Sequence, residues 1–398
     1  MTLLLCLFGI TILFLLTVVS AYQWLLAVVS LIPLKVPHRC VAKQQRVIIL
    51  IPAHNEEVGL PSTLRSIQQV DYPEDCLQVI VIADRCMDAT AFVAGKYGAT
   101  TLERTTGEGA KGEAIAWAIQ ELKKNRMNYD AVMIMDADAI VHPQALNAFN
   151  DGLVVGHDIQ QGYNYLSNPW ESPFTRVIAV TSVLKNKLFF GGKSRLGLSG
   201  MLTGTGMCLR RDTIERHGWT AFSVGEDWEY SVHLLLAGEQ IHFNESARVL
   251  AKESHDMSQA SRQRLRWASG RHAVVTSSAK RLFLEGIRRR KVYLIDAAVT
   301  LMAPNYSTQA SLAILSVGAT WLLMTDPTWG ILFLWSVGVL ASLVMYFLLG
   351  ALLTESPLRT LAGLPLIPLF LPWRMMIEML GLLGYGRKEW GRSSRRPS

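Results

Sequence analysis

The sequence predicts an α/β domain built on a parallel sheet and flanked by transmembrane helices. From about residue 45 to 140, apolar runs of strand length alternate with helix-like segments, the order typical of a parallel sheet covered by helices. Residues 2–34, 297–325 and 327–354 carry no charged side chain. The hydrophobic content of 50% and the mean hydropathy of +0.23 are higher than a purely soluble enzyme needs.

Residues 1–34 are predicted to be a transmembrane anchor. A helix rising about 1.5 Å per residue over this length exceeds a hydrocarbon core of about 30 Å. No basic segment precedes it and no small-residue cleavage site follows, which disfavours a signal peptide. Tyr22 and Trp24 lie too deep in the segment to be interface anchors of a single upright span. The segment is therefore either a tilted span or a short re-entrant hairpin. The basic residues from Lys35 to Arg46 place the next domain in the cytoplasm.

Residues 45–257 are expected to form the catalytic domain. Helices are predicted over 58–69, from Asp88 onward, and from the glycine-rich loop 107–112 through Leu122. Buried strands are predicted at 46–52, 78–83, 98–102 and 132–135, with a further strand at 161–165.

Acidic side chains stand at the ends of three of these strands: Glu56, Asp84, and the pair Asp136 and Asp138. In open α/β sheets, ligands bind outside the carboxyl ends of the strands. Asp136 and Asp138 are two residues apart and therefore share one face of an extended segment. Alone, such a pair is more often a solvated turn. With three strand ends in register and Lys111 beside them, the pattern predicts a cleft for a nucleotide diphosphate, with Mg²⁺ or Mn²⁺ on the carboxylates.

Two features further along the chain have a structural and a functional interpretation. Glu226 and Asp227 are predicted to start a helix, where the helix dipole favours negative charge. Alternatively, one of them is a general base at the mouth of the pocket. The loop 197–206 is rich in Gly, Ser and Thr, and it either lets backbone approach a ligand closely or is an ordinary connection.

Residues 258–292 are predicted to be an amphipathic interfacial helix. Gln263, Arg266 and Trp267 fall at positions i, i+3 and i+4, so they lie on one face. An amide, a bidentate guanidinium and an indole on one face suit a pyrophosphate and a sugar ring. The basic residues between Lys280 and Lys291 indicate contact with an anionic membrane surface.

The C-terminal region is predicted to return to the membrane. Residues 293–354 form a transmembrane hairpin with its turn at 325–327 outside, and Pro304 with Asn305 breaks the first stretch. Residues 355–398 form an interfacial or re-entrant segment and a basic cytoplasmic tail. The prediction is therefore a multi-pass protein of an inner or plasma membrane, with a cytoplasmic catalytic domain.

Charge and cysteine usage narrow the function classes. The net charge is +7, and much of the excess lies beside apolar runs, which favours membrane lipids over nucleic acid as partners. No nucleic-acid-binding motif is visible. The five cysteines are scattered without metal-site spacing, which indicates a reduced cytoplasmic domain.

The motifs together resemble glycosyltransferase family 2, in particular its membrane branch of processive β-glycan synthases, such as cellulose, hyaluronan and poly-N-acetylglucosamine synthases. The resemblance covers roughly residues 45–270. The matching motifs are Ile51-Pro52-Ala53-His54-Asn55-Glu56-Glu57, Val81-Ile82-Ala83-Asp84, Lys111 in its loop, Asp136-Ala137-Asp138, Glu226-Asp227, and Gln263-Arg264-Leu265-Arg266-Trp267.

The resemblance implies a GT-A fold and inverting transfer from a nucleotide sugar, with a UDP-sugar as the expected donor. It implies that Asp227 is the catalytic base and that Asp138, with Asp136, holds the metal and the nucleotide. Glu226 and Trp267 would face the acceptor. The remaining donor-binding positions that it implies are Pro52, Glu56, Asp84 at the base, Lys111, Gln263 and Arg266.

The chain departs from the family pattern at two positions. Gly225 stands where relatives carry Thr before the acidic pair, and Asp84 is followed by Arg85-Cys86-Met87 rather than by an acidic or small polar residue. The leading expectation for the acceptor is a growing polysaccharide chain, and the alternative is a lipid: ceramide, diacylglycerol or a polyprenyl-linked sugar. The span count is low for a secretion channel, which would call for a homo-oligomer or a secretion partner. A non-catalytic scaffold is disfavoured because Asp138, Asp227 and Trp267 are all present.

Overall fold

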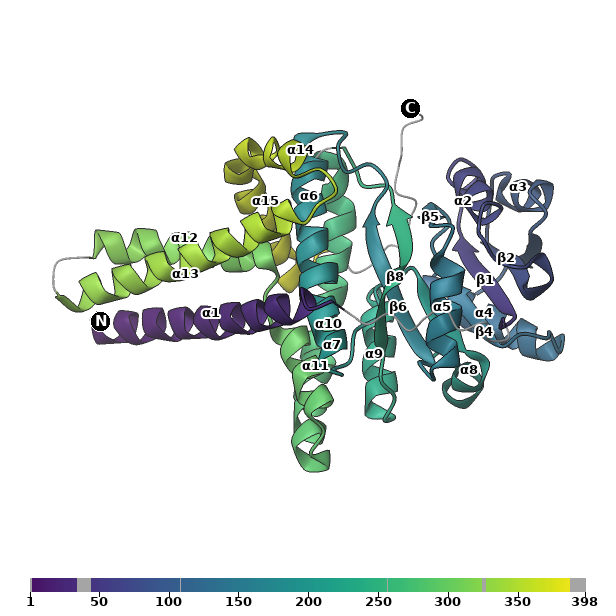
Figure 1. The fold of residues 1–398 in the computed structure, drawn as a ribbon, viewed down its shortest axis with the longest axis horizontal. Helices are drawn as coiled ribbons and strands as arrows, with labels where there is room; N and C mark the ends of the chain where they lie inside the picture. The colour runs from purple at the N-terminus through teal and green to yellow at the C-terminus, as the bar shows by residue number, and fades with distance from the viewer. Residues whose placement is uncertain (1, 34–43, 108, 256, 324–326, 387–398) are drawn as a thin grey trace.

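A single eight-stranded sheet organises the catalytic part of the molecule (Figure 1). The structure is a computed structural model, and it describes residues 2–33, 44–107, 109–255, 257–323 and 327–386. The strands lie in the order β3-β2-β1-β4-β7-β6-β8-β5. Their bounds are β1 (Val47–Ala53), β2 (Leu77–Asp84), β3 (Thr100–Arg104), β4 (Ala131–Ile134), β5 (Ala139–Val141), β6 (Ile159–Leu166), β7 (Met207–Arg210) and β8 (His242–Ala251).

The first half of this sheet confirms the predicted parallel arrangement, and the second half departs from it. Strands β3, β2, β1 and β4 are parallel neighbours. Strand β7 then runs antiparallel to both β4 and β6, and β5 runs antiparallel to β8. The sheet is therefore mixed: the four strands predicted to be parallel are parallel, and the later strands, for which no direction was predicted, add antiparallel pairs.

The apolar strand β1 explains why helices cover both faces of the sheet. Its side chains alternate, so that Ile49 and Ile51 pack in one buried cluster while Ile48 and Leu50 pack in another. One cluster is covered by helices α2 (Leu60–Ile67), α3 (Thr90–Lys96) and α5 (Ala145–Val154). The other is covered by α4 (Lys111–Lys124), α8 (Arg211–His217) and α9 (Glu226–Leu236).

The predicted elements appear with shifted boundaries. The third strand begins at Thr100 rather than Gly98, because Gly98 takes a φ of +80° that ends helix α3. Helix α9 begins at Glu226, as expected from the acidic pair. A short helical turn, η1 (Glu74–Cys76), precedes β2. The four cysteines in the described residues are free, and Cys40 lies outside them.

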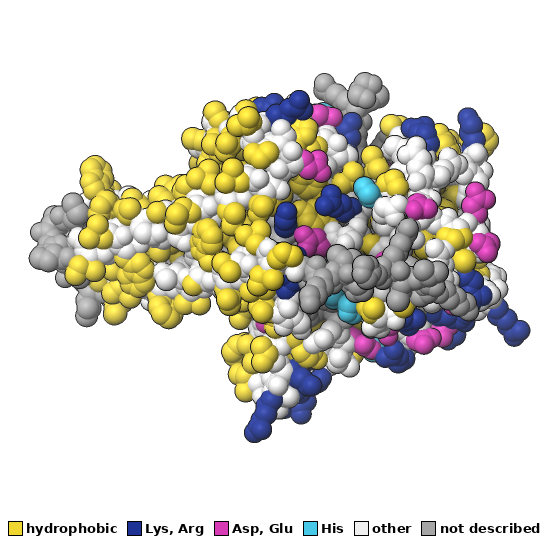
Figure 2. Space-filling view, in the orientation of Figure 1, with side chains coloured by type: hydrophobic (Ala, Val, Ile, Leu, Met, Phe, Trp, Pro, Cys, Tyr) yellow, Lys and Arg dark blue, Asp and Glu magenta, His cyan; other side chains and the backbone are white. Residues whose placement is uncertain are grey.

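Three apolar helices form an arm that projects from the catalytic domain (Figure 1). Helix α1 (Thr2–Ser30) packs against α12 (Tyr306–Leu322) and α13 (Pro327–Leu352), with Leu16, Ala313 and Leu343 in their shared core. Figure 2 shows hydrophobic side chains covering the surface of this arm. Helix α1 is continuous, so the re-entrant hairpin considered for residues 1–34 was wrong.

Three segments of the described chain are long and apolar enough to cross a membrane: Cys6–Ser30, Trp329–Leu352 and Pro357–Leu382. The last consists of α14 (Pro357–Leu361), the turn η3 (Leu364–Leu366) and α15 (Ile367–Leu382). Helix α12 has 17 residues and follows the expected break at Pro304 and Asn305, which separates it from α11 (Val292–Met302). The basic tail from residue 387 lies outside the described residues.

A junction of helices joins the arm to the sheet. Helix α6 (Pro173–Val183) continues through a π-helical segment, η2 (Leu184–Phe190), into α7 (Gly191–Arg195). A methyl group on Gly192 would lie 2.3 Å from the carbonyl oxygen of Leu26, so only glycine permits this contact with α1. The long helix α10 (Met257–Arg289) packs against α9, α11 and α15, and Lys and Arg side chains gather where α10 meets α11 (Figures 1 and 2).

Candidate active site

One cavity of about 1660 Å³ contains nearly all of the residues that the sequence singles out. It begins at the carboxyl ends of the parallel strands, passes the start of α9 and one face of α10, and continues between the apolar helices. The predicted residues that line it are Pro52, Glu56, Lys111, Asp136, Asp138, Glu226, Asp227, Gln263, Arg266 and Trp267.

Lys111 lies between the Asp136 carboxylate after β4 and the Glu226 carboxylate at the start of α9. Its ammonium donates to Oδ1 of Asp136 at 2.6 Å and to the carbonyl oxygen of Gly204 at 2.7 Å, and it lies 3.7 Å from Oε1 of Glu226. Burial works against its charge, but Asp136 and Glu226 hold the pKa of Lys111 above its ordinary value. The lysine therefore stays charged and links the end of β4 to the start of α9.

The glycine-rich loop 197–206 places backbone directly against Asp227. Gly204 has a φ of +82°, and a methyl group on it would lie 3.4 Å from Oδ2 of Asp227. The other carboxylate oxygen, Oδ1, accepts a hydrogen bond from the backbone N–H of Trp228 at 2.8 Å. These contacts fix the orientation of the Asp227 carboxylate at the helix N-terminus.

Both carboxyl groups at the start of α9 have pKa values raised by burial. Burial raises the pKa of Asp227, opposed by its hydrogen bond from Trp228 and by Lys111. Burial also raises the pKa of Glu226 to about 7, because Lys111 offsets the desolvation only in part and Asp227 adds to it. A carboxylate with a raised pKa and a fixed orientation is suited to accept a proton.

One face of α10 forms the opposite wall of the cavity. Gln263, Arg266 and Trp267 all line it, as their spacing predicts. The Trp267 side chain is 44% exposed, and the guanidinium of Arg264 lies 5.6 Å from its ring centroid. An exposed indole in a polar cavity provides a flat surface on which a sugar ring can stack.

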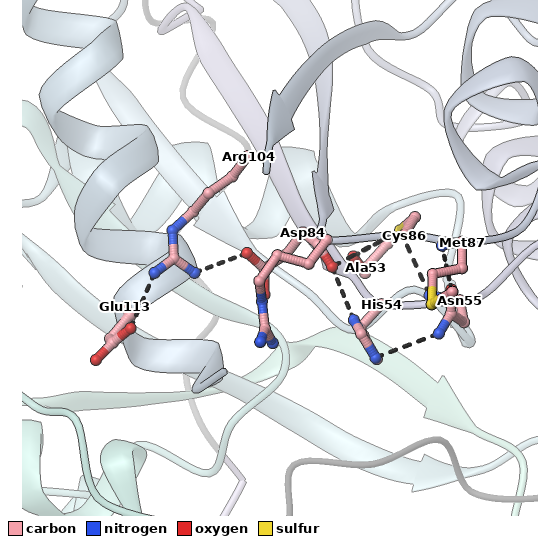
Figure 3. Close-up of polar contacts among 9 residues, drawn as sticks. Ala53, His54, Asn55, Asp84, Cys86, Met87, Arg104 and Glu113 are labelled. Atoms are coloured by element: carbon pink, nitrogen blue, oxygen red, sulfur yellow. Dashed lines mark hydrogen bonds and ion pairs between the residues drawn. The ribbon is translucent and has the colours of Figure 1, made fainter. Parts of the chain in front are cut away.

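Asp84 does not line the cavity (Figure 3). Its carboxylate is fully buried, with Oδ1 bonded to Arg104 at 2.7 Å and Oδ2 to Arg85 at 3.2 Å. Figure 3 shows Arg104 lying between Asp84 and Glu113 of α4, which it contacts at 2.9 Å. In this arrangement the carboxylate links the ends of β2 and β3 through its ion pair with Arg104. The backbone carbonyl of Asp84, not its carboxylate, contacts His54 after β1.

The ends of β1 and β2 are fastened to each other beside Asp84 (Figure 3). Asn55 and Arg85 both take positive φ, +57° and +48°. The amide oxygen of Asn55 accepts the backbone N–H of Met87 at 2.8 Å, and His54 Nδ1 lies 2.7 Å from the carbonyl oxygen of Asp84. Non-glycine residues rarely adopt this conformation, and such strain is commonly found at ligand sites.

The residues at the end of β4 fit a divalent cation that is shared with a ligand. Asp136 and Asp138 supply hard oxygen donors in one cavity. No group of three or more His, Cys, Asp or Glu side chains with metal-site geometry occurs among the described residues. Two carboxylates with phosphate oxygens completing the shell are the arrangement that Mg²⁺ uses at nucleotide sites.

The structure also brings residues into the cavity that the motifs did not indicate. Lys185 of η2 and Arg271 of α10 line it close to Asp227, and Gln23 of α1 and Asp296 of α11 line it among the apolar helices. A signal existed for Arg271, which stands four residues after Trp267 and so shares its face. For Lys185, the signal was a pair of lysines, Lys185 and Lys187, inside the otherwise uncharged run 177–190.

Comparisons with known proteins agree with this geometry. A family model described as "Glycosyltransferase like family 2" matches residues 44–270, more than half of the chain. The "Probable glycosyltransferase YdaM" of Bacillus subtilis (strain 168) is 28% identical over 264 residues, which are 62% of this chain and 60% of that protein. The match thus spans less than two thirds of the relative's length.

A solved structure shares the fold. The mannosyltransferase PcManGT from Pyrobaculum calidifontis, in complex with GDP-Man and Mn²⁺, superimposes with a TM-score of 0.54 and 19% sequence identity. The alignment covers 85% of this chain and 98% of that one. The mixed α/β sheet is therefore of the GT-A type, and the chain belongs to glycosyltransferase family 2.

Proposed function

We propose that this enzyme transfers a sugar from a nucleoside diphosphate sugar to a hydroxyl group of a lipid-linked acceptor in a membrane. The observation that carries the proposal is the continuity of the cavity. It runs from Asp136 and Asp138, past Asp227, to side chains of α1 and α11. A donor at the strand ends and an acceptor arriving between apolar helices would meet at Asp227.

The donor half of the cavity is suited to a sugar diphosphate. A divalent cation on Asp136 and Asp138 would neutralise the charge of the leaving diphosphate. Lys111 keeps Asp136 in place, and Arg266 and Gln263 approach from α10. The mannosyltransferase of similar fold is described with a nucleotide sugar and Mn²⁺, which supports a donor of this class.

Asp227 would act as the base of a single inverting displacement. The acceptor hydroxyl gives its proton to Asp227 Oδ2, its oxygen bonds to the anomeric carbon, and the bond to the diphosphate breaks. No covalent enzyme intermediate is needed. The hydrogen bond from Trp228 to Oδ1 leaves Oδ2 to face the cavity beside Gly204.

The far half of the cavity favours a lipid-linked acceptor. Val18 and Val19 of α1 line it together with Ile295 and Val299 of α11, so apolar side chains form part of its wall there. An amphiphilic acceptor would place its chain along these side chains and its polar end at Asp227. The same arrangement supports the proposal that the protein lies in a membrane, and the basic residues from Lys35 to Arg46 favour a catalytic domain on the cytoplasmic side.

A growing polysaccharide chain is the second candidate, and a different observation favours it. Gln23, Asn305 and Gln309 line the cavity, and each has a buried side-chain amide atom without a hydrogen-bond partner in the described structure. Sugar hydroxyls would satisfy such atoms. The Gln-x-x-Arg-Trp motif on α10 also resembles that of polymer synthases.

Product analysis separates the two candidates. The purified enzyme in lipid vesicles is incubated with Mn²⁺ and a panel of radiolabelled UDP- and GDP-sugars, and the products are extracted and sized. We expect organic-soluble product carrying one added sugar per acceptor. A high-molecular-weight, water-soluble product would show that the acceptor is a growing polysaccharide chain and not a lipid. No incorporation from any donor, with nucleotide binding also absent, would contradict both.

A further inference from the structure

The π-helical segment η2 carries one lysine into the cavity at the junction with the arm. Leu184 and Leu188 of η2 are buried in a cluster with Ala27 of α1 and Tyr346 of α13. Lys185 is not part of that cluster; its side chain is exposed and lines the cavity. π-helical segments inside α-helices occur frequently at functional sites, because they turn one side chain out of the helical register.

Lys185 has no hydrogen-bonding or ionic partner among the residues that the structure describes. Two largely buried lysines nearby do have partners. Lys111 is bonded to Asp136, and the fully buried Lys193 is bonded to Asp296 at 2.7 Å and to Thr300 at 2.8 Å. Burial lowers the pKa of Lys185, Arg271 lowers it further, and only Asp227 opposes them. The ammonium group thus lies in the cavity with Asp227 as the nearby negative charge and without a direct bond to a carboxylate.

Arg271 brings a second, partly unsatisfied cation to the same place. Its guanidinium donates to the carbonyl oxygens of Leu301 and Ala303 at the end of α11 and lies 5.8 Å from the ring centroid of Trp228. Its Nε is buried without a partner in the described structure. Burial lowers the pKa of Arg271 as well. These bonds hold the guanidinium in place while Nε remains available.

We propose that Lys185 and Arg271 form an anion-binding subsite next to Asp227, and that its occupant is the phosphate group of the lipid-linked acceptor. Asp227 and Glu378 supply two negative charges against the three cations Lys185, Arg271 and Arg374. Lys111 is already neutralised by Asp136 and Glu226. One more anion would complete the balance. The inference rests on the proposed function, because it names the chemical class of that acceptor.

The position of the subsite favours the acceptor over the donor as the source of this phosphate. Both cations come from elements that pack against the apolar helices: η2 against α1 and α13, and Arg271 against the end of α11. The donor carboxylates lie at the end of β4, with Lys111 and the start of α9 between. A phosphate bound by Lys185 would have apolar side chains within reach for the chain attached to it.

Binding of a short isoprenyl monophosphate to the purified enzyme, without donor, tests the subsite. We expect the phosphate to bind at least about tenfold more tightly than the isoprenol of the same length, since one charge-assisted hydrogen bond contributes about that factor. Lys185→Met should remove most of this difference, and Lys185→Arg should retain it. Lys187→Met, which removes a neighbouring lysine that does not line the cavity, should leave it unchanged.

Three outcomes would overturn the inference: equal binding of phosphate and alcohol, unchanged binding in Lys185→Met, or equal losses in Lys185→Met and Lys187→Met. Competition by inorganic phosphate as strong as by the isoprenyl phosphate would assign the subsite to a free anion and refute the lipid. An unchanged thermal midpoint in Lys185→Met shows that the variant is folded. Because no sugar is transferred in this experiment, its result is independent of whether the proposed transfer occurs.

Discussion

At the scale of single residues, Asp227 is the side chain on which the proposed chemistry depends. Its removal should separate catalysis from donor binding. Asp227→Asn keeps the bond from the Trp228 N–H but cannot accept a proton, so transfer should fall by at least about a hundredfold, the usual contribution of a general base. Titration calorimetry with UDP and Mn²⁺ should show nearly unchanged affinity.

The matched control is Asp212→Asn, which changes an exposed acid at the start of α8. Turnover of Asp227→Asn close to wild type would refute the assignment of the base. The raised pKa of Asp227 also predicts that transfer falls on the acid side at a higher pH than a solvated aspartate would give.

Glu226 should make the stability of the protein depend on pH. Its folded pKa of about 7 exceeds the ordinary 4.5, so the folded state holds the proton more tightly. The resulting stability is complete below about pH 4.5 and is lost as pH rises to 7. Glu226→Gln should therefore raise the thermal midpoint at pH 8 and leave it unchanged near pH 4.5, with a gain of at most about 3 kcal/mol.

Thermal unfolding in detergent measures this effect. Glu215→Gln, at an exposed position of α8, serves as the comparison and should show no such pH dependence. If Glu226→Gln follows the wild-type midpoint at every pH, the carboxyl group is not perturbed as described.

Residues differ in how far the sequence alone predicts them. Asp136, Asp138 and Asp227 could be placed because strand ends and helix starts are readable from local pattern. The surroundings of Asp84 could not be predicted, because Arg104 lies on the neighbouring strand. Only the register of β2 with β3 pairs the two residues. Lys185 was missed because its environment is made by α1 and α13, which are remote in sequence.

At the scale of elements, a contact between two glycines sets the distance between the two helices of the site. Gly225 precedes α9, and Gly270 lies within α10. A methyl group on Gly270 would lie 2.9 Å from the backbone nitrogen of Gly225 and 3.1 Å from the carbonyl carbon of Val224. The start of α9 can therefore approach the Gln-x-x-Arg-Trp face only while both positions lack side chains. This gives the departure from Thr at position 225 a physical reason.

Gly270→Ala should displace the start of α9 and with it Asp227. We expect turnover to fall by about ten- to a hundredfold, because small misplacements of a catalytic group have effects of that size. Gly95→Ala in α3 is the control, since nothing lies within 4 Å of the added methyl group. Steady-state transfer rates compare the two, and equal rates would show that the helix contact tolerates the extra atom.

Among the elements, the alternation of β1, β2 and β4 with helices was readable, but the antiparallel half of the sheet was not. Strand β5 has three residues and β7 has four, so neither is long enough to show a period. Strand β5 pairs with β8 and β7 pairs with β4 and β6, so both are placed by partners remote in the chain.

At the scale of the whole molecule, the last apolar segment decides which side of the membrane the tail occupies. By length and composition, Pro357–Leu382 qualifies as a span. However, α15 packs on the catalytic side: Phe370 joins a core with Phe174 and Val274, and the Trp373 indole donates to Ser261 of α10 at 2.9 Å. Arg374 and His272 also contact Glu378. An interfacial position for this segment, rather than a third span, therefore stays our prediction.

We therefore predict that the tail lies on the same side as the catalytic domain. A reporter fused after residue 398 and a cysteine introduced at exposed Asp212 should react with an impermeant reagent only in inside-out vesicles. The control is a cysteine at residue 326, between α12 and α13, which should react only from the opposite side. Opposite labelling of the tail and Asp212 would make Pro357–Leu382 a true span.

The three contacts of Lys111 imply an order of substrate addition. One ammonium group is shared between Asp136, the Gly204 carbonyl and Glu226. A divalent cation that binds Asp136 together with the donor diphosphate would compete with Lys111 for that carboxylate and leave more of the lysine charge to Glu226. We therefore predict that the acceptor reacts only after the donor has bound. Initial-rate kinetics should accordingly be sequential and ordered, with the nucleotide competitive against the donor and noncompetitive against the acceptor.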